Sequence, residues 1–104
     1  MGKTHELKIL PEYFKDVSLG KKTFELRKND RDFQIGDKLI LREWCGQYTG
    51  NQVERWIGYI FFGDGNYGLA PGYCILGLYR SYTLHSWTLQ RISRATDRVE
   101  TIPL

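Results

Sequence analysis

Three charged side chains, Lys22, Glu25 and Arg27, have the residue types and spacing best suited to chemistry on a ligand. Glu25 and Arg27 are two positions apart, so in a strand their side chains point to one face. Lys22 would fall on the opposite face of an ideal strand, but it stands where the chain leaves a predicted helix and can turn toward the same cleft. Two cations around a carboxylate can hold a phosphate, and the carboxylate can accept hydrogen bonds from a base amino group.

The same residues leave two other interpretations open. A lysine that is desolvated beside other cations can lose its proton and act as a base or nucleophile, which would make Lys22 and Glu25 catalytic residues. An ordinary surface ion pair between Glu25 and either cation would contribute little.

Basic residues gather around this triad. Residues 15–31 contain six basic and three acidic side chains, and the difference equals the net charge of +3 of the whole chain. We therefore expect an anionic or strongly polar ligand here. The predicted binding residues around the triad are Lys21, Thr23, Lys28 and Arg31, with Tyr13 at the mouth of the cleft. A net charge of +3 is compatible with nucleic-acid binding but is too small to indicate it by itself.

The elements that must position these residues can be predicted from periodicity. Residues 5–9 alternate as a short strand, and Pro11 begins a helix that Gly20 ends. Residues 23–28 form the next strand. Its apolar side chains, Phe24 and Leu26, are predicted to enter the core. The polar side chains of Thr23, Glu25 and Arg27 are predicted to lie on the opposite face of the strand.

Further strands are predicted at residues 38–44, 53–62 and 73–79, separated by glycine-containing connections, of which residues 45–51 form a hairpin connection. With one early helix, this pattern predicts an α+β protein built on a small, mostly antiparallel β-barrel. We assign residues 1–80 to this domain. Residues 81–104 form a C-terminal extension whose pattern fits a helix, a strand, an arm or an unstructured tail.

Composition narrows the classes of function. Cys45 and Cys74 match no metal-binding or redox spacing and are predicted to be buried free thiols, and the two histidines are isolated in the sequence. We expect no metal site and no cofactor. The longest apolar run is too short to span a bilayer, so a cytoplasmic protein without membrane contact is predicted. Trp44 and Trp56 lie on predicted strands, where core packing is more common than stacking on a ligand.

The segment from Gly20 to Arg27 resembles the GxKxxExR motif of the ASCH superfamily, whose members have a PUA-like β-barrel. Residues 7–13 are similar to the strand-to-helix entry of that superfamily. Further blocks resemble one of its bacterial and phage branches, which has no assigned function: residues 28–33, 36–37, 42–44, 48–50 and 72–78. The resemblance covers about residues 4–79.

The resemblance implies a cleft between the early helix and the barrel, lined by Lys22, Glu25 and Arg27. ASCH proteins are generally proposed to bind RNA or nucleotides, so the implied partner is RNA, single-stranded nucleic acid or a modified nucleotide. One small branch hydrolyses acetylated cytidine; its motif shares the lysine and arginine but has Thr in place of Glu25. The alternative is therefore a small metal-independent amidohydrolase acting on an acylated nucleoside, for which Glu43 and Glu54 match a further glutamate by type only.

Overall fold

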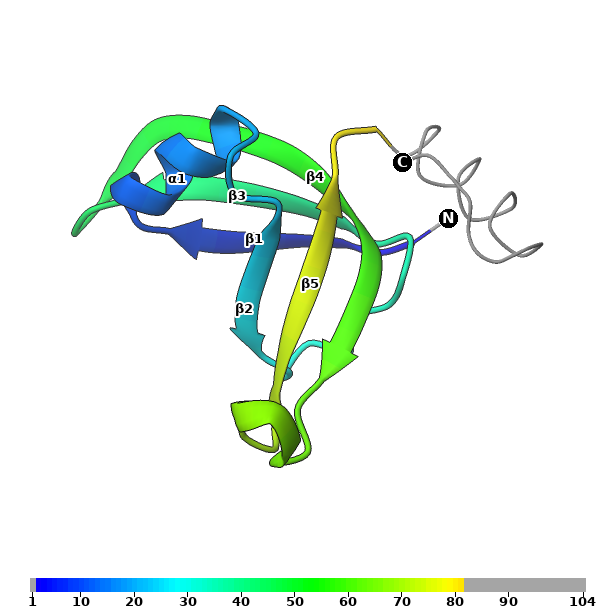
Figure 1. Cartoon of the computed structure of the whole chain (residues 1–104). Helices are drawn as coiled ribbons and strands as arrows, with labels where there is room; N and C mark the ends of the chain where they lie inside the picture. Colours follow the sequence, from blue (N-terminus) through cyan, green and yellow to red (C-terminus); the bar gives the residue numbers. More distant parts are fainter. Residues whose placement is uncertain (1, 82–104) are drawn as a thin grey trace.

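A computed structural model describes residues 2–81 (Figure 1). Five strands, one α-helix and one short 3-10 helix make up the described part of the chain. In order they are β1 (Thr4–Ile9), α1 (Pro11–Ser18), β2 (Phe24–Lys28), β3 (Lys38–Trp44), β4 (Tyr48–Phe62), η1 (Asn66–Gly68) and β5 (Tyr73–Tyr79).

The strands form one sheet with the order β1-β3-β4-β5-β2. β1 pairs with β3 in parallel, and the other three pairings are antiparallel. The sheet curls into a half-barrel, and α1 lies at the end where β1 finishes (Figure 1). The predicted α+β class, the early helix and the mostly antiparallel sheet are thus confirmed.

The helix begins and ends at the predicted residues. Pro11 occupies its first turn, where the missing backbone N–H costs no hydrogen bond. Gly20 has a φ of 81°, a left-handed conformation that favours glycine after a helix. A Cβ at Gly20 would also meet the guanidinium of Arg80, but that flexible side chain can move, so the positive φ is what favours glycine there.

The core lies on the inner face of the curled sheet and beneath α1. Alternate residues of β1 and β3 enter it, as period-two strands require. Its buried members are Leu7, Ile9, Val17, Phe33, Leu39, Leu41, Ile57, Cys74 and Leu76.

Two local predictions are wrong. β4 starts at Tyr48, five residues earlier than predicted, because Trp44 pairs directly with Tyr48 around a tight turn at Gly46, whose φ is 86°. Cys45 lies in that turn and is exposed, whereas Cys74 is buried as expected.

The predicted orientation of β2 is also wrong. Phe24 and Leu26 are 46% and 55% exposed, whereas Glu25 is only 4% exposed. The strand therefore turns its charged face inward, because that face meets compensating cations (described below), and its apolar side chains lie outside the core.

Apart from Ser81, the predicted C-terminal extension lies outside the described residues. No helix within residues 2–81 is both long and apolar enough to cross a membrane.

Candidate functional site

A pocket of about 420 Å³ opens where the end of β1, α1 and β2 meet. Its walls combine charged and apolar groups, which is typical of sites that orient a polar ligand. The lining residues are Lys8, Ile9, Leu10, Tyr13, Lys22, Phe24, Glu25, Leu26 and Arg27.

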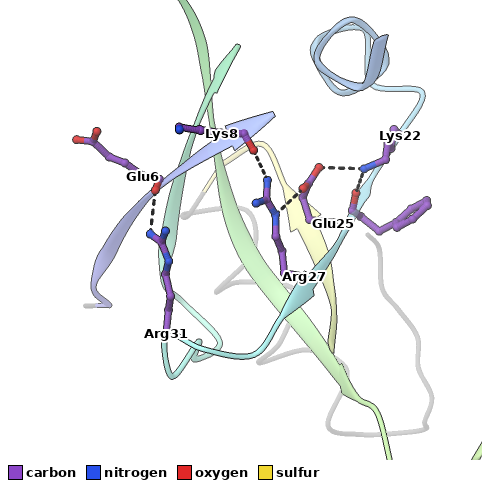
Figure 2. Close-up of polar contacts among 7 residues, drawn as sticks. Glu6, Lys8, Lys22, Glu25, Arg27 and Arg31 are labelled. Carbon is purple, nitrogen blue, oxygen red and sulfur yellow. Dashed lines mark hydrogen bonds and ion pairs between the residues drawn. The ribbon is translucent and has the colours of Figure 1, made fainter. Parts of the chain in front are cut away.

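The carboxylate of Glu25 is the centre of this site (Figure 2). One oxygen, Oε2, accepts a hydrogen bond from Lys22 Nζ at 2.9 Å, and the other, Oε1, accepts one from Arg27 Nε at 3.1 Å. A carboxylate so deeply buried needs such partners, since an unpaired charge away from water is costly. The three residues singled out in the sequence therefore form one hydrogen-bonded triad.

Lys22 is held by more than its carboxylate partner. Its ammonium also donates to the carbonyl oxygen of Phe24 at 2.7 Å, and it lies 4.7 Å from the centre of the Phe24 ring and 5.5 Å from that of Tyr13. An ammonium has three N–H donors, and these two acceptors use two of them. One donor of Lys22 is left for a ligand.

Arg27 and Arg31 close the gap between the two edge strands of the sheet. Arg27 Nη2 donates to the carbonyl of Lys8 at 2.6 Å, and Arg31 Nη1 donates to the carbonyl of Glu6 at 2.9 Å (Figure 2). Within residues 2–81, β1 and β2 are the two ends of the strand order and share no backbone ladder. Side chains of β2 and its following loop thus satisfy alternate carbonyls on the free edge of β1.

Local structure explains why Lys22 reaches the site. The backbone N–H groups of Lys21 and Lys22 both donate to the carbonyl of Asp16, at 2.9 and 3.0 Å, which fixes the chain immediately after α1. The carbonyl of Thr23, immediately before β2, accepts a hydrogen bond from the backbone N–H of Leu78 on β5 at 2.9 Å. Lys22 is therefore placed between a fixed helix end and a paired strand.

Four of the predicted binding residues line the pocket: Tyr13, Lys22, Glu25 and Arg27. The other four, Lys21, Thr23, Lys28 and Arg31, are exposed and do not line it. The sequence interpretation missed Lys8, Ile9 and Leu10, and it assigned Phe24 and Leu26, which also line the pocket, to the core. Residues 8–10 lie in the strand-to-helix segment that the resemblance singled out, but they join the pocket only through the curl that brings β1 opposite β2.

The charges around the pocket favour an anion. Two cations, Lys22 and Arg27, and one carboxylate, Glu25, are among the lining side chains, which leaves one positive charge in excess. The pKa of the Tyr13 phenol is raised, first by its hydrogen bond with Glu12, then by the charge of that carboxylate and by desolvation. The phenol therefore stays protonated near neutral pH. In the part of the chain that the structure describes, no three His, Cys, Asp or Glu residues gather as metal ligands would.

A second buried polar pair, His5 and Asp37, was not anticipated from the sequence. Nε2 of His5 lies 2.7 Å from Oδ2 of Asp37, and the backbone N–H groups of Lys3 and Gln34 donate to the same carboxylate at 2.9 and 3.0 Å. An ionised carboxylate only accepts, so Nε2 of His5 carries the proton. The His5 ring packs edge-on against Phe33, with the ring centres 4.9 Å apart. This pair fastens the start of β1 to the turn before β3.

Comparison with known proteins places this architecture in a family. Residues 4–78, more than half of the chain, match the family model described as "Domain of unknown function (DUF3850)". The chain belongs to the DUF3850 family. The matched residues include all of the pocket lining described above.

A relative of this DUF3850 protein is found in Escherichia phage P2, where it is described as "Uncharacterized 12.9 kDa protein in GpA 3'region". The two are 51% identical over 55 residues, which is 52% of this chain and 50% of the phage protein. The match thus spans about half the length of that relative.

Proposed function

We propose that the pocket binds a nucleotide unit of RNA or of another single-stranded nucleic acid, or a modified nucleotide, on a PUA-like fold of the ASCH type. The observation that carries this proposal is the pair of cations, Lys22 and Arg27, held on the buried carboxylate of Glu25 at 2.9 and 3.1 Å. Cations fixed before a ligand arrives lose little conformational entropy when they bind it.

Each cation keeps donors for a phosphate or a base oxygen. Lys22 has one N–H beyond those used by Glu25 and Phe24, and Arg27 uses two of its five donors on Glu25 and Lys8. The ring of Phe24 and the aliphatic lining supply apolar contact for a base. The exposed Lys21, Thr23, Lys28 and Arg31 are proposed to form a rim that attracts the phosphate backbone.

Glu25 fits a positioning role better than direct reading of a base amine. Both of its oxygens are already hydrogen-bonded, and only 4% of the residue is accessible. Its effect on a ligand would therefore be exerted through the two cations that it holds.

Hydrolysis of an acylated nucleoside, with Lys22 and Glu25 as catalytic residues, is the second candidate. The contact of 2.9 Å between them is short enough for proton exchange, which is the observation in its favour. A lysine acts as a base only as the neutral amine, however, whereas Lys22 is paired as a cation with the carboxylate of Glu25. The geometry thus supports binding more directly than catalysis.

The test measures binding of single-stranded RNA, single-stranded DNA and duplex DNA at two salt concentrations. We expect Lys22→Gln to weaken binding of a single strand by about tenfold, in line with the loss of a charge-assisted contact. Lys15→Gln is the matched control, because Lys15 is an exposed lysine of α1 outside the pocket.

Glu25→Gln separates positioning from net charge. If charge alone governed affinity, removal of an anion would strengthen binding; if Glu25 positions the cations, the variant should bind more weakly. Absence of binding by the wild-type chain, or equal losses in Lys22→Gln and Lys15→Gln, would contradict the proposal. Release of free acid from acylated nucleosides by the wild-type chain but not by Lys22→Gln would instead support the hydrolase.

A further inference from the structure

A second cluster of cations and aromatic rings adjoins the pocket on the outer face of β1, β3 and β4. Lys8, Arg42, Trp44 and Tyr48 form this cluster, hereafter the hairpin platform. Lys8 Nζ lies 4.5 Å from the centre of the Trp44 ring and 5.9 Å from that of Tyr48, and Arg42 Cζ lies 4.0 Å from the centre of the Tyr48 ring.

Strand register brings these four residues together. Lys8 is paired with Arg42 across β1 and β3, and Trp44 is paired with Tyr48 at the end of the β3–β4 hairpin. The carboxylate of Glu43 accepts hydrogen bonds from Thr49 and Asn51, at 2.8 and 2.9 Å, which braces the hairpin. The hairpin extends past the end of β1 and beside the start of α1 (Figure 1).

Lys8 connects the hairpin platform to the pocket. Its carbonyl oxygen accepts the bond from Arg27 inside the site, while its side chain runs away from Arg27 (Figure 2) and its ammonium reaches the Trp44 ring. The pocket and the hairpin platform therefore share one residue of β1.

We infer that the hairpin platform binds the nucleotides next to the one held in the pocket, so that the ligand is a single-stranded polynucleotide and not a free nucleotide. This inference rests on the proposed function for the nature of the ligand. Tyr48 is 45% exposed, and a guanidinium lying against its ring extends the flat surface on which a base can stack.

The charges of the hairpin platform assign different tasks to its two cations. Nη1 of Arg42 lies 3.4 Å from Glu6 Oε1, and this ion pair partly compensates the charge of Arg42. The flat face of its guanidinium is therefore the part that we expect to stack on a base. Lys8 has no such carboxylate partner among the described contacts and is suited to a phosphate. We therefore expect stacking, rather than charge, to account for most of the contribution of Arg42.

The structure offers a close control for Arg42. Lys38 lies on the same strand, 5.6 Å from the centre of the Trp56 ring and 3.2 Å from Glu54, and its side chain is 32% exposed against 35% for Arg42. Like Arg42, Lys38 therefore lies near an aromatic ring and has a glutamate partner. Unlike Arg42, it is not paired with Lys8, the residue that the hairpin platform shares with the pocket. Arg42→Gln and Lys38→Gln remove the same formal charge.

The experiment compares a mononucleotide with RNA and DNA octanucleotides for the wild-type chain and each variant. We expect the octanucleotides to bind more tightly than the mononucleotide. Arg42→Gln and Tyr48→Leu should each weaken octanucleotide binding by about tenfold, the scale of one lost stacking contact. Tyr48→Phe and Lys38→Gln should retain that binding, and mononucleotide affinity should be unchanged in all four.

Equal affinity of the wild-type chain for both ligand lengths would overturn the inference, as would equal losses in Arg42→Gln and Lys38→Gln. Lys22→Gln separates the two proposals. If Lys22→Gln weakens binding of both the mononucleotide and the octanucleotides, while Arg42→Gln and Tyr48→Leu weaken binding of neither, the pocket binds nucleotides and the hairpin platform does not. If only the hairpin platform variants lose the octanucleotide, the platform stands and the pocket proposal fails. No binding of either ligand by the wild-type chain would refute both.

Discussion

The guanidinium of Arg27 on β2 donates to the backbone carbonyl of Lys8 on β1 at 2.6 Å, and this contact joins the two edge strands of the half-barrel. The same side chain contacts Glu25 at 3.1 Å, so one arginine serves both the closure of the sheet and the geometry of the pocket. Stability and ligand binding should therefore be coupled at this residue.

Arg27→Gln should lower the free energy of unfolding by about 1–3 kcal/mol, because it removes one partner of the buried Glu25 carboxylate. Arg31→Gln is the matched comparison: like Arg27, Arg31 donates to a carbonyl of β1 through an exposed bond, but it does not contact Glu25, so we expect a loss of about 0.5 kcal/mol. Urea denaturation of both variants measures the difference. Equal losses would show that the contact of Arg27 with Glu25 adds no stability.

Acid should weaken the fold through Asp37. Burial alone would raise the pKa of this carboxyl, but hydrogen bonds from His5 and from the backbone of Gln34 and Lys3, with the charge of His5, outweigh it and the net pKa is lowered. The ionised form therefore contributes stability that is fully present above the unfolded pKa of about 3.9 and is lost as the pH falls through the lower folded pKa.

Asp37→Asn tests this dependence. At neutral pH the variant should be less stable by about 1–3 kcal/mol. The Asp37 carboxylate accepts hydrogen bonds from three donors on its two oxygens, whereas an amide has only one oxygen that can accept. The difference from wild type should shrink below about pH 4, where Asp37 takes up a proton. Urea denaturation across acidic pH measures both curves, and a difference that stays constant with pH would exclude Asp37 as the source.

Arg55 should be required for the position of α1. It is buried, and its Nη2 donates to the carbonyl of Val17 near the end of the helix at 2.8 Å. Arg55→Leu should reduce the free energy of unfolding by about 1–3 kcal/mol, because it removes a buried, charge-assisted hydrogen bond and leaves the Val17 carbonyl with only the N–H of Gly20. It should also weaken ligand binding, since Lys22 follows that helix end.

Arg80→Gln is the control for Arg55→Leu. The pKa of Arg55 is lowered by its burial and by the charge of Arg80, so removal of that exposed charge should leave stability within about 0.5 kcal/mol of wild type. Thermal and urea unfolding measure both variants. A larger loss in Arg80→Gln than in Arg55→Leu would contradict the role assigned to Arg55.

The two cysteines should react very differently with a thiol reagent. Cys45 is exposed in the β3–β4 turn, whereas Cys74 is buried and its pKa is raised by burial and by the charge of Asp30. We expect one thiol to react in the native protein and both to react in denaturant, as measured by colorimetric titration. Cys45→Ser should abolish the native reaction; fast native reaction in that variant would place Cys74 at the surface.

Periodicity and turn chemistry were sufficient to predict most of the elements. Pro11 and Gly20 mark the ends of α1 because proline and glycine have strong local backbone preferences, and alternation located β1, β3 and β5. The start of β4 was missed because the pairing of Trp44 with Tyr48 is a contact between strands, which local propensity does not contain.

The spacing of Lys22, Glu25 and Arg27 likewise determined which residues form the triad, because the turn after α1 and the two-residue repeat of β2 are local. Which face of β2 is buried was decided only by the tertiary structure. Phe24 and Leu26 are more apolar than Glu25, yet Glu25 is the buried one. Curling of the sheet brings β1 opposite β2, and only there can two cations compensate a carboxylate removed from water.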